Sequence, residues 1–144
     1  PTLETKEQKD LLKIACSSTE ILCIKTNDML DYWEIETKTF KPKMVRFSPR
    51  KQMHQLEDLF TPLIDKNNIK LYFFISGTIP NFLYHDLKRV SQILVNLLTN
   101  AIKYTKKGAI LVKVDWMTSK LTTSNELGVV KYTVSDSGWG ISKK

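Results

Sequence analysis

The sequence lacks several features that would place it outside the ordinary globular domains. None of its apolar runs approaches the roughly 18 residues that a membrane-spanning helix requires, and it contains no repeat or low-complexity tract. Glycine and proline each occur only five times in 144 residues, which excludes a collagen-like or proline-rich chain. The length suffices for one domain and its core, or for a small domain preceded by a helical segment.

Cysteine is also scarce, and its placement argues against a disulfide. Cys16 and Cys23 lie on one segment that is expected to be helical, which separates them by about 10 Å at ~1.5 Å per residue. A disulfide requires Cα atoms within roughly 7 Å of each other. We therefore expect reduced thiols in a segment that faces the cytosol.

The chain begins at Pro1, with neither an initiator methionine nor a basic and apolar leader. We interpret it as an internal piece of a longer protein. This segment is expected to make no membrane contact, whether or not the longer protein is anchored in a membrane.

Negative charge is in the minority, with 15 acidic and 22 basic residues and a net charge of +7. Such an excess raises the hypothesis of a nucleic-acid partner. The lysines are scattered along the sequence, however, and the aromatic residues do not interleave with them. We therefore favour a solvated surface whose charge attracts a phosphate-bearing ligand at long range, and we expect no nucleic-acid partner.

The N-terminal part of the sequence is typical of one long helix. From Glu7 to Thr37 there is no proline or glycine, and apolar residues recur on one side, which suits a neighbouring helix. Two prolines in the segment 41–49 end this pattern around a short β-like MVRF, and we place a boundary between two units near residues 40–44. Helical spacing resumes from Arg50 to Lys66.

The C-terminal part alternates strands with a helix. Strands are expected at 69–76 and 81–84, with turns at 67–68 and 77–80. A helix is expected from Asp86, its N-cap, to about Thr105, with Lys106 and Lys107 in a frayed last turn and Gly108 as the stop. Two further strands, at 109–117 and 127–135, flank a polar hairpin-like loop at 118–125.

The helix that begins at Asp86 carries a polar stripe beside its expected core face. The core face comprises Val90, Ile93, Leu94, Leu97, Leu98 and Ala101, and the residues expected to point away from it are Lys88, Ser91, Thr99 and Lys106. The polar stripe comprises Arg89, Gln92, Asn96, Asn100 and Lys103. Such a flank borders a crevice if another element stands beside it.

Asn96 and Asn100 lie one helical turn apart, although asparagine costs roughly 0.5 kcal/mol relative to alanine inside a helix. A row of amide oxygens that ends in Lys103 suits magnesium held partly by the protein and partly by a nucleotide phosphate. A solvated polar flank with a capping role explains the same spacing equally well.

The segment DSGWGI, residues 136–141, follows an expected buried strand. Gly138 and Gly140 permit positive φ angles and the close approach of a flat ligand. Asp136 is able to accept a hydrogen bond from an exocyclic amine such as that of adenine. A tight turn after a strand is the commoner interpretation of this pattern alone. The pattern points to a ligand site only because it follows the helix that carries Asn96 and Asn100.

Three segments together carry a family resemblance. HDLKRVSQILVNLLTNAIKYTKKGAILVKV (85–114) and VSDSGWGI (134–141) resemble the asparagine box and first glycine box of sensor histidine kinases, within the ATPases that include Hsp90 and MutL. TNDMLDYWEIETKTF (26–40) resembles the end of the second helix of the kinase dimerisation hairpin. The resemblance spans nearly the whole chain, and the order of its motifs is specific. It indicates a sensor histidine kinase, of the hybrid type.

The resemblance implies a fold and two units. The fold would be α+β, a long helix followed by an α/β sandwich whose mixed sheet has helices on one face, the Bergerat-type ATP-binding fold, incomplete at the C-terminus. Residues 1–40 would form the second helix of the hairpin, through which the protein would form a homodimer, a dimeric four-helix bundle. Residues 44–144 would form the N-terminal part of the ATP-binding domain.

The resemblance also implies roles for individual residues. Asn100 would ligate magnesium between the ATP phosphates, and Asn96 would face those phosphates. Lys103 would pair with a phosphate, and Tyr104 would lie against the nucleotide. Asp136 would accept from the adenine amino group, while Gly138 and Gly140 would shape the pocket floor; Trp139 stands where a small residue is more usual. The D-x-x-R-x-x-Q run at 86–92 would cap and support the helix.

Other expected parts are missing from the sequence. Neither His54 nor His85 lies in the context of the phosphate-accepting histidine, which would precede this chain, and the ATP lid would follow it. The fragment alone is therefore expected to be inactive. The whole protein would use ATP and Mg²⁺ to phosphorylate that histidine, from which a response-regulator receiver domain would take the phosphoryl group. A catalytically silent dimerisation and nucleotide-sensing module is the alternative.

Overall fold

The computed structural model describes residues 5–64, 69–118 and 128–140. Its elements run in the order α1 (Lys6–Glu36), β1 (Val45–Phe47), α2 (Pro49–Ile64), β2 (Ile69–Ile75), β3 (Leu83–His85), α3 (Leu87–Tyr104), β4 (Gly108–Thr118) and β5 (Gly128–Asp136). The expected turn at 67–68 and most of the expected loop at 118–125 lie outside the described residues. No described helix has the length and apolar character needed to cross a membrane.

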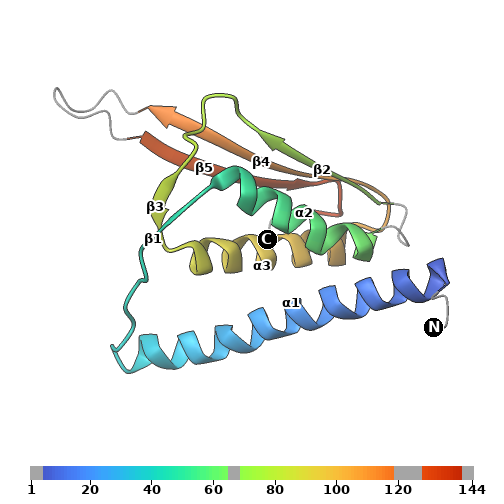
Figure 1. Cartoon of the computed structure of the whole chain (residues 1–144), viewed down its shortest axis with the longest axis horizontal. Coiled ribbons are helices and arrows are strands. Elements are labelled where there is room, and N and C mark those ends of the chain that lie inside the picture. The colour runs from blue at the N-terminus through green and yellow to red at the C-terminus, as the bar shows by residue number, and fades with distance from the viewer. Residues whose placement is uncertain (1–4, 65–68, 119–127, 141–144) are drawn as a thin grey trace.

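The described chain forms three layers (Figure 1). A mixed sheet in the order β2-β4-β5 lies on one side, with β2 parallel and β5 antiparallel to the central β4. Helices α2 and α3 cover one face of this sheet, and α1 lies beyond them. Strands β1 and β3 form a separate antiparallel pair. The expected fold class, a long helix followed by an α/β sandwich with helices on one face, is confirmed.

The core lies between the sheet and helices α2 and α3. Alternate residues of β4 point inward and are fully buried, as expected for a strand with one covered face. Ile21 and Ile24 of α1 pack against this core. The completely buried side chains include Met53, Phe60, Val95, Leu98, Ile110, Val112 and Val114.

The core face of α3 differs from the expected one. Leu94, Val95, Leu98 and Ala101 are buried, whereas Ile93 is 58% and Leu97 45% exposed. The sheet and α2 select the face centred on Leu94 and Leu98, which leaves Ile93 and Leu97 about 100° away around the helix. Ser91, which was expected to point away from the core, is half-buried and its Oγ accepts a hydrogen bond from Gln52 Nε2 at 3.0 Å.

Gln52 continues this interaction toward the sheet. Its Oε1 accepts a hydrogen bond from Tyr132 Oη at 2.9 Å, and only 2% of the Gln52 surface is exposed. Burial raises the pKa of Tyr132 to about 12 because the phenolate is poorly solvated there. Tyr132 is therefore protonated at neutral pH, so its hydroxyl serves as the donor to Gln52.

Candidate functional site

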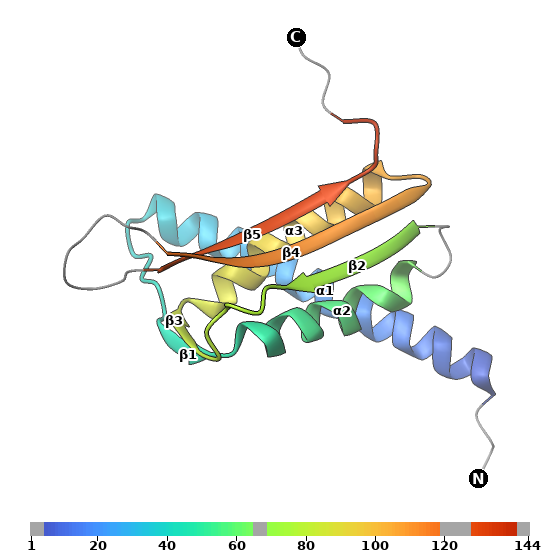
Figure 2. The ribbon, with the colours of Figure 1, turned by 90° about the horizontal axis from the view of Figure 1, so that it is seen from above.

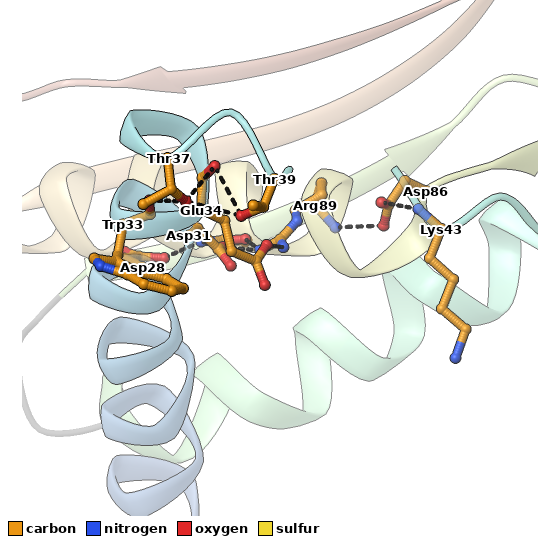
Figure 3. A network of polar contacts seen from close by, with 10 residues as sticks. Asp28, Asp31, Trp33, Glu34, Thr37, Thr39, Lys43, Asp86 and Arg89 are labelled. Carbon is orange, nitrogen blue, oxygen red and sulfur yellow. Dashed lines mark hydrogen bonds and ion pairs between the residues drawn. The ribbon is translucent and has the colours of Figure 1, made fainter. Parts of the chain in front are cut away.

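Helix α3 is anchored at its N-terminus by Asp86, as the sequence predicts. Asp86 is buried, and its two carboxylate oxygens accept from the backbone N–H groups of Arg89, at 3.1 Å, and Lys43, at 2.7 Å. The first contact is an N-cap, and the second ties the segment after α1 to the start of α3 (Figure 3). One carboxylate therefore fixes where the polar stripe of α3 begins.

The expected polar stripe is divided into two halves by α1. Arg89, Gln92 and Asn96 form hydrogen bonds or ion pairs with α1, so this half borders a packed helix rather than an open crevice. Asn100 and Lys103, farther along α3, are exposed. The first half therefore does not line an open crevice, and a crevice beside the half that ends at Lys103 stays a prediction.

The described part of the DSGWGI turn, residues 136–140, lies beside the C-terminal end of α3. A Cβ atom added to Gly138 would lie 2.6 Å from the carbonyl oxygen of Tyr104, the last residue of α3. Figure 2 shows the end of β5 beside the C-terminal end of α3. The structure thus brings the acidic turn against the end of α3 that carries Asn100 and Lys103, and we call this region the corner.

Hydrogen bonds hold the turn in place. Asp136 Oδ1 accepts from the backbone N–H of Gly138 at 2.8 Å. The Ser137 N–H donates to the Ala109 carbonyl at 3.1 Å, and Ser137 Oγ accepts from the Ala109 N–H at 2.9 Å. The turn is therefore tied to the start of β4, and the second carboxylate oxygen of Asp136, on an exposed side chain, is able to accept from a ligand.

The two glycines of the turn serve different needs. Gly140 has a φ of 69°, in the left-handed region. Gly138 does not use the positive φ that glycine permits; glycine is required there because no side chain fits against the Tyr104 carbonyl. Helix α3 ends at Tyr104 with Thr105 as its C-cap, close to the expected end, but Lys106 and Lys107 lie outside the helix rather than in a frayed last turn, and Gly108 begins β4.

Cations and flat rings surround this corner. Lys103 Nζ lies 5.2 Å from the centre of the Tyr104 ring, and Lys106 Nζ lies 5.7 Å from that of Trp139, a residue that is 83% exposed. Exposed ammonium groups attract phosphate oxygens, and exposed rings provide surfaces for a flat base. The corner therefore has the chemistry to bind a nucleotide.

A metal at this corner would depend on ligands from elsewhere. The described residues include no group of three or more His, Cys, Asp or Glu side chains able to hold a metal ion. The exposed amide of Asn100 offers one oxygen ligand, which fits magnesium, a cation that usually keeps several waters and is completed by substrate phosphates. The donor set therefore fits a magnesium–nucleotide complex rather than a free protein-bound ion.

The two histidines lie elsewhere. His54 is exposed on α2, 3.6 Å from Glu57, and His85 lies in β3, where its Nδ1 accepts from the Asp86 N–H at 2.8 Å. Sequence reasoning did miss the α1 residues that contact the polar stripe, Lys25, Asp28, Asp31 and Glu34. Their three-residue spacing is the signal that was available.

Thr105, just after α3, provides a stability test of the corner. Its side-chain oxygen is buried and has no hydrogen-bond partner among the described residues. We expect Thr105→Val to raise the free energy of unfolding by about 1 kcal/mol, because it removes a buried hydroxyl that makes no bond. Thr99→Val is the matched control, since the Thr99 hydroxyl donates to the Val95 carbonyl at 2.9 Å. Denaturant unfolding that gives Thr105→Val no advantage over Thr99→Val would contradict the expectation.

Comparison with known proteins assigns the family. Residues 85–144 match the model of the histidine kinase-, DNA gyrase B- and HSP90-like ATPases. The sensor histidine kinase RcsC of Escherichia coli is 36% identical over 116 residues, which cover 78% of this chain and 12% of RcsC. The autoinducer 2 sensor kinase/phosphatase LuxQ of Vibrio cholerae is 30% identical over 138 residues, which cover 96% of this chain and 16% of LuxQ. The chain thus spans only a small part of these relatives.

Solved structures share the fold. Full-length ShkA in complex with AMPPNP matches 98% of this chain and 28% of its own, with a TM-score of 0.67 and 22% identity. The Acinetobacter baumannii histidine kinase AdeS matches 87% of this chain and 57% of its own, with a TM-score of 0.61 and 19% identity. Sequence matches over most of the chain and a shared fold agree, and the chain belongs to the histidine kinase family.

Proposed function

We propose that the corner between α3 and the DSGWGI turn binds ATP, and that the chain is part of the ATP-binding catalytic unit of a sensor histidine kinase. The observation that supports the proposal is the close approach of Gly138 to the Tyr104 carbonyl, because Asp136 belongs to the same turn as Gly138 and Asn100 lies one helical turn before Tyr104. The bound AMPPNP of the ShkA structure, an ATP analogue, supports the choice of ligand.

The phosphates are assigned to the α3 side of the corner. Asn100 contributes its amide oxygen to magnesium, and Lys103 pairs with a phosphate. Asn96, one turn earlier, faces the phosphates once its contacts with α1 are released. Magnesium, when bound, neutralises phosphate charge during transfer. The chain itself holds the triphosphate in position, which is the main contribution of a protein to phosphoryl transfer.

The adenine is assigned to the turn. The free oxygen of Asp136 accepts from the exocyclic amino group, and Tyr104 lies against the nucleotide. Gly138 and Gly140 keep the floor of the site open, since Gly138 packs against backbone and Gly140 takes a conformation that other residues rarely adopt. These roles require the turn and the end of α3 to keep the spacing that the structure has.

In the whole protein, the γ-phosphoryl group of ATP would pass to a histidine outside this chain and then to a response-regulator receiver domain. Residues 1–40 would form the second helix of the dimerisation hairpin and residues 44–144 part of the ATP-binding domain. A homodimer through α1 is supported by the exposed apolar side chains of that helix, which include Leu22 at 66%, Met29 at 75% and Trp33 at 64% exposure.

Titration calorimetry of the full-length protein with ATP, with and without magnesium, tests the proposal. We expect binding that requires magnesium, together with phosphate incorporation from γ-labelled ATP. Absence of ATP binding would overturn the nucleotide site. Binding without phosphate incorporation would identify the catalytically silent nucleotide-sensing module instead.

Asp136 provides a test of base recognition. We expect Asp136→Ala to weaken ATP binding by on the order of 1–3 kcal/mol, the usual effect of removing one partner of a buried hydrogen bond. Binding of inosine triphosphate, which lacks the exocyclic amino group, should change much less, so the variant loses the preference for adenine. Equal binding of ATP by the variant and the parent would remove Asp136 from the site.

A further inference from the structure

The contact between α1 and α3 is a ladder of polar side chains. Lys25, Asp28 and Asp31 on α1 contact Arg89, Gln92 and Asn96 on α3, and we call these six residues the polar ladder. Arg89 pairs with Asp31, and Gln92 Nε2 donates to Asp31 at 2.7 Å and also to Asp28. Asn96 Nδ2 donates to Asp28 at 3.3 Å, and Lys25 donates to Asn96 Oδ1.

At one end of the polar ladder, Arg89 lies beside Asp31 and Glu34 of α1 (Figure 3). The Asp31 side chain is 12% and the Arg89 side chain 21% exposed. Arg89 also lies 3.7 Å from Glu34 and 5.1 Å from the centre of the Phe40 ring. An ion pair that is largely withdrawn from water is screened less than a surface pair, so this end anchors α1 to α3.

The other end of the polar ladder occupies Asn96. The Asn96 amide oxygen accepts from Lys25 and its nitrogen donates to Asp28, so both polar atoms of this side chain are engaged by α1. Asn100, one turn farther along α3, is exposed. The helix therefore presents one asparagine to solvent and holds the other against α1.

We propose that α1 and the magnesium–nucleotide complex compete for Asn96. This inference rests on the proposed function, and it adds a regulatory contact to that site. The docked arrangement lowers nucleotide affinity, because Asn96 reaches a phosphate only after it leaves Lys25 and Asp28. By thermodynamic linkage, the nucleotide weakens the docking of α1 by the same factor, and such couplings typically amount to about 5- to 150-fold.

Weakening the anchor, the contacts of Arg89 with Asp31 and Glu34, without altering Asn96 tests whether α1 and the nucleotide compete. Asp31→Asn keeps the shape of the side chain but removes its charge, and Glu34→Gln does the same at the more exposed partner of Arg89. We expect each variant to bind magnesium–ATP more tightly than the parent, Asp31→Asn by about five-fold or more. Asp10→Asn is the matched control, an equal loss of charge at an exposed site on α1, and it should bind as the parent does.

Exchanging the charges of the anchor gives a second test. Asp31→Arg alone and Arg89→Asp alone should each tighten nucleotide binding, while the double variant should return toward the affinity of the parent.

Hydrogen exchange provides the reciprocal measurement, and saturating magnesium–ATP should speed amide exchange in residues 25–37 of the parent. Circular dichroism confirms that each variant is folded, and Glu34→Gln gives the answer if a change at Asp31 unfolds the protein.

The outcomes separate the two proposals. A parent that binds magnesium–ATP, with Asp31→Asn and Glu34→Gln variants of the same or lower affinity, overturns the competition and leaves the proposed function intact. Unchanged exchange of residues 25–37 on binding overturns it as well. A parent that does not bind magnesium–ATP overturns both.

Discussion

Asn100→Ala is expected to lower the affinity for magnesium–ATP by about 10- to 150-fold, while the protein remains folded. The variant removes the amide oxygen assigned to magnesium, and contacts to charged groups are worth about 1.5–3 kcal/mol. Asn100 is exposed, so its truncation leaves no cavity. Because alanine favours a helix over asparagine by roughly 0.5 kcal/mol, stability should stay the same or rise slightly.

Magnesium removal makes this test specific. In the presence of a chelator, the parent and Asn100→Ala should bind ATP with the same residual affinity, because the assigned contact acts through the metal. Asn81→Ala, an exposed asparagine outside α3, is the control and should leave both affinities unchanged. If Asn100→Ala binds magnesium–ATP as the parent does, Asn100 is not a metal ligand, and the two asparagines are explained by the polar ladder and a solvated flank.

The elements were predictable because their signals are local. The long helix lacks proline and glycine from Glu7 to Thr37, and it forms as α1 at Lys6–Glu36. Asp86 caps α3 as expected, and the inward residues of β4 alternate as a half-covered strand requires. The corner itself was anticipated only through the resemblance, since spacing alone left a solvated flank and an ordinary turn open.

What the sequence did not predict depends on contacts between distant segments. A helical wheel shows the direction of each side chain of α3 but not which neighbour lies there, so Ile93 and Leu97 were assigned to the core although they are exposed. The same limit applies to Asn96. Its partners on α1, Lys25 and Asp28, lie about 70 residues earlier in the sequence, and only the crossing of the two helices brings them together.

Gly138→Ala is the second change with a large expected effect, because it acts on the contact that forms the corner. Its added Cβ would lie 2.6 Å from the Tyr104 carbonyl and 2.7 Å from Asp136 Oδ1. The carbonyl belongs to the last turn of α3 and cannot move aside as a flexible side chain does, so the turn itself must shift. Overpacking of this kind typically costs about 1–3 kcal/mol.

The shift would also separate the two halves of the proposed site. Asp136 would lose its hydrogen bond to the Gly138 N–H, 2.8 Å long in the parent, and with it the orientation of its free oxygen. We therefore expect Gly138→Ala to weaken ATP binding about ten-fold or more, measured by calorimetry beside denaturant unfolding. Gly77→Ala is the matched control, since its Cβ would meet nothing within 4 Å and both measurements should stay near the parent. Parent-like ATP affinity in Gly138→Ala would mean that the nucleotide does not span α3 and the turn, because no ligand held by both could tolerate that displacement.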